Sequence, residues 1–111
     1  MLYTMHLYKE PMNMIRLGLK KYELRLNDEK RQNIKKGDKI EFIDPKDERN
    51  RLTVSVKAVK HYPSFKELYD DLPLSEIGYN EKEAGSPRDM DIYYPQEKQE
   101  KYGVLAIKVA L

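Results

Sequence analysis

The 111-residue chain contains no cysteine and only two histidines, His6 and His61. Without cysteine it can form neither a disulfide framework nor a thiolate zinc site. Two histidines that lie far apart in the sequence are also a poor set of metal ligands. We therefore expect no metal ion and no cofactor.

The sequence also lacks a long apolar run. No stretch approaches the roughly 20 apolar residues of a membrane-spanning helix, and residues 1–9 lack the basic start and long apolar centre of a secretion signal. Hydrophobic residues make up 40% of the chain and charged residues 36%. Regularly spaced Ile, Val, Leu and Tyr are still sufficient for a folded core. We expect one cytoplasmic domain over residues 1–111 and no membrane segment.

Neither sign of charge is in large excess, because the formal net charge is only +2. The distribution is uneven: residues 1–60 carry 15 Lys and Arg against 9 Asp and Glu, whereas residues 61–111 carry 6 against 10. A basic first half fits an anionic partner; an ordinary solubilising surface explains it equally well. The densest group of positive charges is Lys30, Arg31, Lys35, Lys36 and Lys39.

Hydrophobic periodicity predicts five strands and several short helices. The expected strands cover residues 2–8, 21–26, 39–43, 52–58 and 105–111. The expected helices begin near residues 10, 64, 86 and 95. Because helices and strands do not alternate regularly, the pattern favours an α+β fold, a small mixed β-barrel with short helices packed outside, over a ferredoxin-like sandwich.

The clearest strand covers residues 52–58, in which apolar and polar residues alternate. The alternation predicts that Leu52, Val54, Val56 and Ala58 are buried and that the residues between them are exposed.

Residues 18–27 carry most of the functional argument. Gly18 is expected to end the first helix, since glycine adopts positive φ at little cost. In the strand that follows, every second residue is apolar, so one face is apolar and the other carries Glu23 and Arg25. Lys20 lies at the turn, where its long side chain can reach the same side. We expect Lys20, Glu23 and Arg25 to converge on one cleft; the alternative is a set of solvated surface charges.

Two motifs together resemble the ASCH domain, a family named for homology to activating signal cointegrator and part of the PUA-like superfamily. They are G-x-K-x-x-E-x-R at residues 18–25 and G-D-x-I-x-F at residues 37–42. The similarity includes residues 64–68 and 93–103 and covers most of the chain. It implies a small PUA-like β-barrel with a cleft implicated in RNA or nucleoside binding.

In that family the lysine, the acidic residue and the arginine of the first motif line the cleft, which implies this role for Lys20, Glu23 and Arg25. Lysine offers a point charge for phosphate, arginine a two-pronged donor, and glutamate an acceptor for an exocyclic amine. The further candidate binding residues are Asn27, His6, Ser64 and Tyr93. Ser64 also has the S-x-x-E spacing of a helix cap, and His6 also fits a histidine tucked into a strand.

The resemblance leaves several functions open, of which binding of RNA or a nucleotide-like ligand is the first. Some similar proteins deacetylate acetylcytidine with the motif lysine and a threonine nucleophile three residues later, where this chain has Glu23. Lys20 and Glu23 would then be the catalytic residues, and Glu23 would need a raised pKa to act as a base on water. A ribonuclease that also uses His6 and Arg25 is a third possibility, and a protein-interaction module that uses the acidic second half is a fourth.

Overall fold

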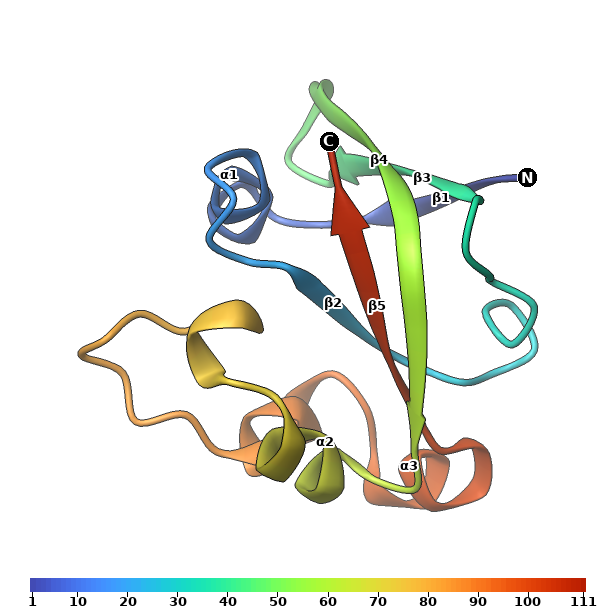
Figure 1. Cartoon of the computed structure of the whole chain (residues 1–111), viewed down its shortest axis with the longest axis vertical. Helices are drawn as coiled ribbons and strands as arrows, with labels where there is room; N and C mark the ends of the chain where they lie inside the picture. Colours follow the sequence, from blue (N-terminus) through green and yellow to red (C-terminus); the bar gives the residue numbers. More distant parts are fainter.

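The computed structural model describes all residues from 1 to 111 (Figure 1). The strands are β1 (Leu2–His6), β2 (Tyr22–Leu26), β3 (Lys39–Asp44), β4 (Asp47–Tyr62) and β5 (Val104–Ala110). The helices are α1 (Lys9–Arg16), α2 (Phe65–Asp71), α3 (Gln96–Tyr102) and two 3₁₀ helices, η1 (Leu74–Glu76) and η2 (Pro87–Ile92). None of the helices is both long and apolar enough to cross a membrane.

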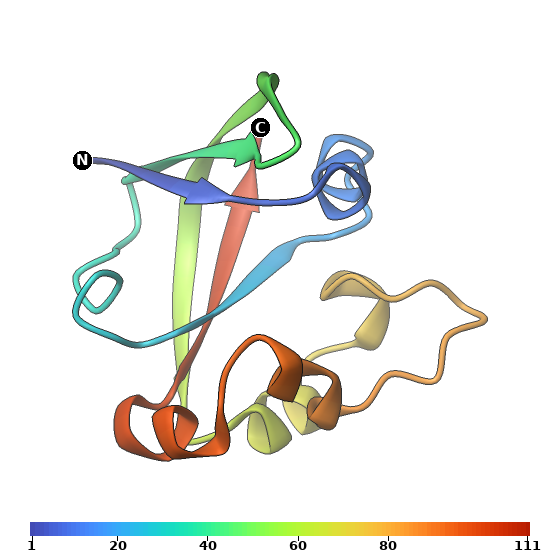
Figure 2. The ribbon, with the colours of Figure 1, turned by 180° about the vertical axis from the view of Figure 1, so that it is seen from behind.

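The five strands form one sheet in the order β1-β3-β4-β5-β2. The β1–β3 pair is parallel and the other three pairs are antiparallel. The sheet curls into a half-barrel, with β1 and β2 as its two edge strands and the short helices outside (Figures 1 and 2). This arrangement confirms the predicted α+β class and PUA-like barrel, and a ferredoxin-like sandwich is wrong.

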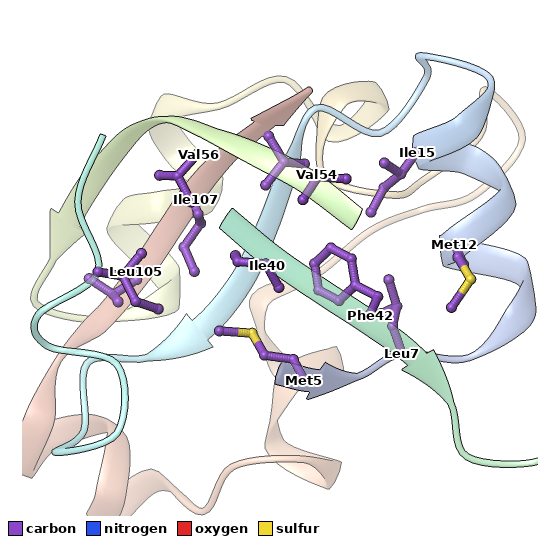
Figure 3. Packing of buried hydrophobic residues seen from close by; sticks show 12 residues of the cluster. Met5, Leu7, Met12, Ile15, Ile40, Phe42, Val54, Val56, Leu105 and Ile107 are labelled. Atoms are coloured by element: carbon purple, nitrogen blue, oxygen red, sulfur yellow. The ribbon is translucent and has the colours of Figure 1, made fainter. Parts of the chain in front are cut away.

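Apolar side chains pack on both faces of the sheet. A cluster of 12 buried residues fills the inside of the half-barrel, with Phe42, Ile40 and Val54 at its centre (Figure 3). A second cluster of 9 buried residues joins β2 and β5 to α2 and the segment that follows it. The consequence for β2 is that both of its faces are covered, so a charged side chain on this strand has little access to water.

The expected alternation along β4 holds only up to Val56. Val54 and Val56 are buried, Leu52 packs against the first cluster while half-buried, and the residues between them are more exposed. The pairing with β5 then shifts between Val56 and Ala58, which leaves Lys57 as the extra residue of a β-bulge. The bulge turns Val59 to the core in place of Ala58. The prediction that Ala58 is buried is therefore wrong, and Ala58 is half-buried.

Helix α1 packs on the sheet through the residues that its periodicity selects. Met12 and Ile15, three residues apart, are buried in the first cluster, whereas Leu17, just beyond the end of the helix, is 72% exposed. Gly18 follows with φ of 76°, a left-handed conformation in which glycine avoids the steric cost of other residues. This turn ends the helix as predicted and directs the chain into β2.

Truncation of Val54 tests the assignment of the first cluster. We expect Val54→Ala to lower the free energy of unfolding by about 1–3 kcal/mol, because the side chain is 1% exposed and its removal leaves a hole among packed neighbours. Thr53→Ala on the opposite face of β4 is the control and should change stability by less than about 0.5 kcal/mol. Urea denaturation followed by circular dichroism measures both, and equal stabilities would contradict a core role for Val54.

Candidate functional site

The candidate site lies at the open seam of the half-barrel, between the edge strands β1 and β2. Helix α1 joins these two strands along the chain (Figure 2). In the antiparallel ladder Glu23 lies opposite Ile107 and Arg25 lies opposite Leu105. Directly opposed residues share a face, and Ile107 and Leu105 belong to the first core cluster. Strand β2 therefore places an acid and a base on the inner face of the half-barrel.

Lys20, Glu23 and Arg25 form one ion cluster there. Lys20 Nζ lies 2.7 Å from Glu23 Oε1. Arg25 donates to Glu23 Oε2 through Nε at 3.2 Å and through its Nη2 at 2.7 Å. The same Nη2 donates to the main-chain oxygen of His6 at 2.8 Å. Arg25 thus connects the two edge strands across the seam, where main-chain hydrogen bonds between β1 and β2 are absent.

The cluster is buried and carries a net positive charge. The side chains of Lys20, Glu23 and Arg25 are 8%, 4% and 12% exposed. Burial alone would raise the pKa of Glu23, but the charges and hydrogen bonds of Lys20 and Arg25 outweigh it and lower that pKa from 4.5 to about 2. Burial likewise opposes the charge of Arg25, and Glu23 and Tyr94 reverse this effect and raise the pKa of Arg25. With two cations and one anion, the group has an excess of one positive charge.

Lys20 reaches the cluster although it precedes the strand. Its main-chain N–H donates to the oxygen of Met14, which holds the turn that follows Gly18 against the end of α1. Its side chain then runs along Gly78, whose φ of 114° is left-handed. A β-carbon built on Gly78 would lie 3.6 Å from Lys20 Cδ. A contact of that length is ordinary, so the left-handed φ, and not a lack of space beside Lys20, is what favours glycine at this position.

The ion cluster forms one wall of a cavity of about 260 Å³. Nine of the fifteen lining residues are hydrophobic, and five are tyrosines: Tyr8, Tyr69, Tyr79, Tyr93 and Tyr94. Glu23 is the only carboxylate in the lining, and no group of three or more His, Asp or Glu side chains in the chain is placed to hold a metal ion. The cavity thus combines aromatic surface with convergent charged groups, the usual composition of a small-ligand site.

Hydrogen bonds and ring contacts fix several of these tyrosines. The hydroxyls of Tyr69 and Tyr79 lie 2.8 Å apart, and the Tyr79 hydroxyl donates to Asp89 Oδ2 at 2.7 Å. Burial and these partners raise the pKa of Tyr79, so its hydroxyl stays protonated. Tyr94 stacks on Phe65 with ring centroids 6.0 Å apart. Tyr69, Tyr79 and Tyr94 are therefore held in place by the protein itself, whereas Tyr8 and Tyr93 are exposed.

The structure brings together some of the predicted site residues and separates others. His6 and Tyr93 line the cavity with the ion cluster, and both are exposed. Asn27 follows the far end of β2, outside the cavity lining, and its main-chain N–H donates to Gly103. Ser64 is also outside the lining. It precedes α2, where its hydroxyl donates to the Glu67 carboxylate without capping the helix main chain.

The sequence reasoning missed the residues that close the cavity opposite the ion cluster. Ile77, Gly78, Tyr79 and Met90 line it from the segment between α2 and α3. This segment contains two short 3₁₀ helices and turns, so it has neither the helical nor the strand period from which side-chain directions are inferred. Its one local signal is Ser86-Pro87, where a capping box with Asp89 begins η2 as expected.

Comparisons with known proteins identify relatives that cover nearly the whole chain. The chain is similar to a hypothetical protein designated PH0355, with 35% identity, a TM-score of 0.83, and coverage of 99% of this chain and 98% of that one. It is also similar to protein PF0455 from Pyrococcus furiosus, with 38% identity, a TM-score of 0.75, and coverage of 99% and 96%. No curated protein matches it significantly. The model of the ASCH domain matches residues 5–111, and the chain therefore belongs to the ASCH domain family.

Proposed function

We propose that the protein binds RNA or a nucleotide-like ligand in the 260 Å³ cavity, as a single domain over residues 1–111. The observation that carries this proposal is the buried ion cluster of Lys20, Glu23 and Arg25, with two cations for one anion, inside an aromatic wall. A buried excess of positive charge is costly by itself. An anionic ligand would remove that cost on binding.

Both cations retain donors for such a ligand. Lys20 Nζ makes one hydrogen bond within the protein, to Glu23, out of the three that an ammonium group can donate. A guanidinium has five N–H groups. Arg25 uses three of them, through Nε and Nη2, on Glu23 and the main-chain oxygen of His6, and its side chain also hydrogen-bonds with Tyr94. Glu23 holds both cations in position and compensates part of their charge while the site is empty.

The aromatic wall suits a base. Tyrosine rings stack on nucleobases with little sequence preference, and Tyr93, at 61% exposure, is available at the opening of the cavity. The volume is slightly below the range of about 300–1,000 Å³ typical of sites for drug-sized molecules. The cavity therefore suits one nucleotide rather than a stretch of duplex.

The geometry favours binding over hydrolysis by Glu23. A general base at neutral pH needs a pKa near 7, whereas the pKa of Glu23 is lowered to about 2 by Lys20 and Arg25. The carboxylate is also fully engaged, because each of its oxygens accepts from one of the two cations. This arrangement stabilises a binding surface and leaves Glu23 a weak base.

The substitution Arg25→Lys tests the proposal. It retains the charge and removes the two-pronged donor of the guanidinium. The free energy of binding uridine monophosphate should therefore become less favourable by about 1–3 kcal/mol. Isothermal titration calorimetry measures the affinity, and thermal unfolding of the same variant shows whether the fold is intact. The control is Arg51→Lys, since Arg51 also forms an ion pair, with Glu41, but lies outside the cavity.

Equal affinity and equal stability of Arg25→Lys and the wild type would contradict a binding role for the guanidinium. A salt titration separates this proposal from a protein-interaction module. Phosphate contacts make the affinity for RNA fall steeply as the salt concentration rises, because counterions are released on binding. A salt-independent affinity would argue for a different ligand class.

A further inference from the structure

A second hollow lies beside the central cavity, between α1 and the turn that joins β3 to β4. The two elements are neighbours in both views of the chain (Figures 1 and 2). This groove has a volume of about 810 Å³, and nine of its ten lining residues are polar or charged. It therefore differs from the central cavity in both size and chemistry.

The floor of the groove is built by hydrogen bonds between its two walls. Arg16 of α1 donates to the Asn50 side chain at 2.8 Å and to the main-chain oxygen of Arg51 at 3.1 Å. On the opposite wall the buried carboxylate of Asp44 accepts from the main-chain N–H of Lys46 at 2.9 Å and from Asn50 at 3.4 Å. The position of the groove thus follows from the packing of α1 on the hairpin.

The charges that remain free in the groove are mainly positive. Asp47 pairs with Arg49 at 3.5 Å, and Asp44 is buried and hydrogen-bonded. Lys9, Lys46 and Arg16 form no ion pair, and Glu10 is the one lining carboxylate that is both exposed and unpaired. The lining carries four cations (Lys9, Arg16, Lys46 and Arg49) against three carboxylates (Glu10, Asp44 and Asp47), an excess of one positive charge. Lys9 and Lys46 are exposed and form no ion pair, which favours an anionic ligand.

Tyr8 connects the groove with the central cavity, because this residue lines both. The side chain is 49% exposed, and Lys46 Nζ lies 5.8 Å from the centre of its ring. A chain that leaves the central cavity past Tyr8 therefore meets an aromatic surface and a cation together. This combination recurs in grooves that follow single-stranded nucleic acids.

We infer that the groove binds the sugar-phosphate backbone next to the nucleotide held in the central cavity, so that the ligand is single-stranded RNA rather than a free nucleotide. The inference rests on the proposed function, because it extends a strand from the same cavity. Lys9 and Lys46 contact phosphates, and Tyr8 separates the nucleotide in the cavity from its neighbour.

The test compares uridine monophosphate with a short single-stranded oligouridylate. The wild type should bind the oligouridylate several-fold more tightly. The double variant Lys9→Ala/Lys46→Ala should lose this advantage and keep its affinity for uridine monophosphate. For the oligouridylate, the slope of the logarithm of the binding constant against the logarithm of the salt concentration should become shallower by about 1.4 in this variant. Each phosphate contact on a single strand contributes about 0.7 to that slope, and two contacts are removed. The matched control is Lys30→Ala/Lys36→Ala, which removes two exposed lysines outside both hollows.

Two results would overturn the inference: equal affinities of the wild type for the two ligands, or equal losses in the two double variants. In either case, binding of uridine monophosphate that still depends on Arg25 would leave the proposed function intact. Conversely, binding of uridine monophosphate that is undetectable, or unchanged in Arg25→Lys, would refute the proposed function itself, and the extension into the groove would be refuted with it.

Discussion

Glu23→Gln is expected to lower the free energy of unfolding by about 3–5 kcal/mol, the usual cost when one partner of a buried ion pair is removed. Glutamine has nearly the same shape as glutamate, so the packing of β2 is preserved. Lys20 and Arg25 would however remain buried without a counter-charge. The amide group would also direct a donor toward one of these cations, which are themselves donors.

The control for this variant is Glu41→Gln. Glu41 pairs with Arg51 at 3.4 Å, but the two side chains are 28% and 48% exposed. Water replaces much of the lost interaction at such a site, and the expected cost is below about 1 kcal/mol. Urea denaturation at pH 7 measures both variants. If Glu23→Gln is as stable as Glu41→Gln, Lys20, Glu23 and Arg25 do not form a buried, mutually dependent unit.

The second large effect is a loss of stability in acid. The pKa of Glu23 is about 2 in the folded protein and 4.5 as its ordinary value. Because the folded pKa is the lower one, the unfolded chain binds more protons between these values, and stability falls as the pH is lowered. The contribution of Glu23 is fully present above pH 4.5 and is lost as the pH falls through about 2. This contribution amounts to about 3 kcal/mol, because each pKa unit between the unfolded and the folded state corresponds to about 1.36 kcal/mol.

Other carboxylates contribute to acid unfolding, so the test is a difference between two profiles. Asp38, for example, accepts hydrogen bonds from Lys35 and the N-terminal amine, and these lower its pKa. The gap in unfolding free energy between the wild type and Glu23→Gln isolates Glu23. This difference in unfolding free energy should be constant above pH 4.5 and should become smaller by about 3 kcal/mol as the pH falls toward 2. Profiles that stay parallel throughout would show that Glu23 has the same pKa in the folded and unfolded states.

Much of the fold follows from local sequence signals, and the exceptions have physical causes. The period of two in β2 and β5, and Gly18 after α1, predicted elements that the structure contains. The exposure of Ala58 was mispredicted because a bulge adds one residue to β4, and an alternating sequence does not reveal how its partner strand is paired.

For the site, the sequence was most informative about the wall that the ion cluster forms, although His6 and Tyr93 were also predicted and line the cavity. Lys20, Glu23 and Arg25 lie within a short stretch, so the geometry of one turn and one strand was enough to bring them together. Tyr79 and Tyr94 reach the cavity through tertiary packing of an irregular segment, which no local period encodes. Asn27 directly follows β2, whose extended backbone places it at the far end of the strand and outside the cavity lining.

We propose that the protein binds its ligand at the ion cluster of the seam and not at the exposed basic connection between β2 and β3. Titration of ¹⁵N-labelled protein with uridine monophosphate, followed by NMR, tests this claim most directly. We expect the largest shift changes at the Arg25 Nε–H signal and at the backbone amides of Lys20, Glu23 and Gly78, which surround the cavity. Shift changes confined to Lys30, Lys35 and Lys36, with the cavity signals unmoved, would contradict it.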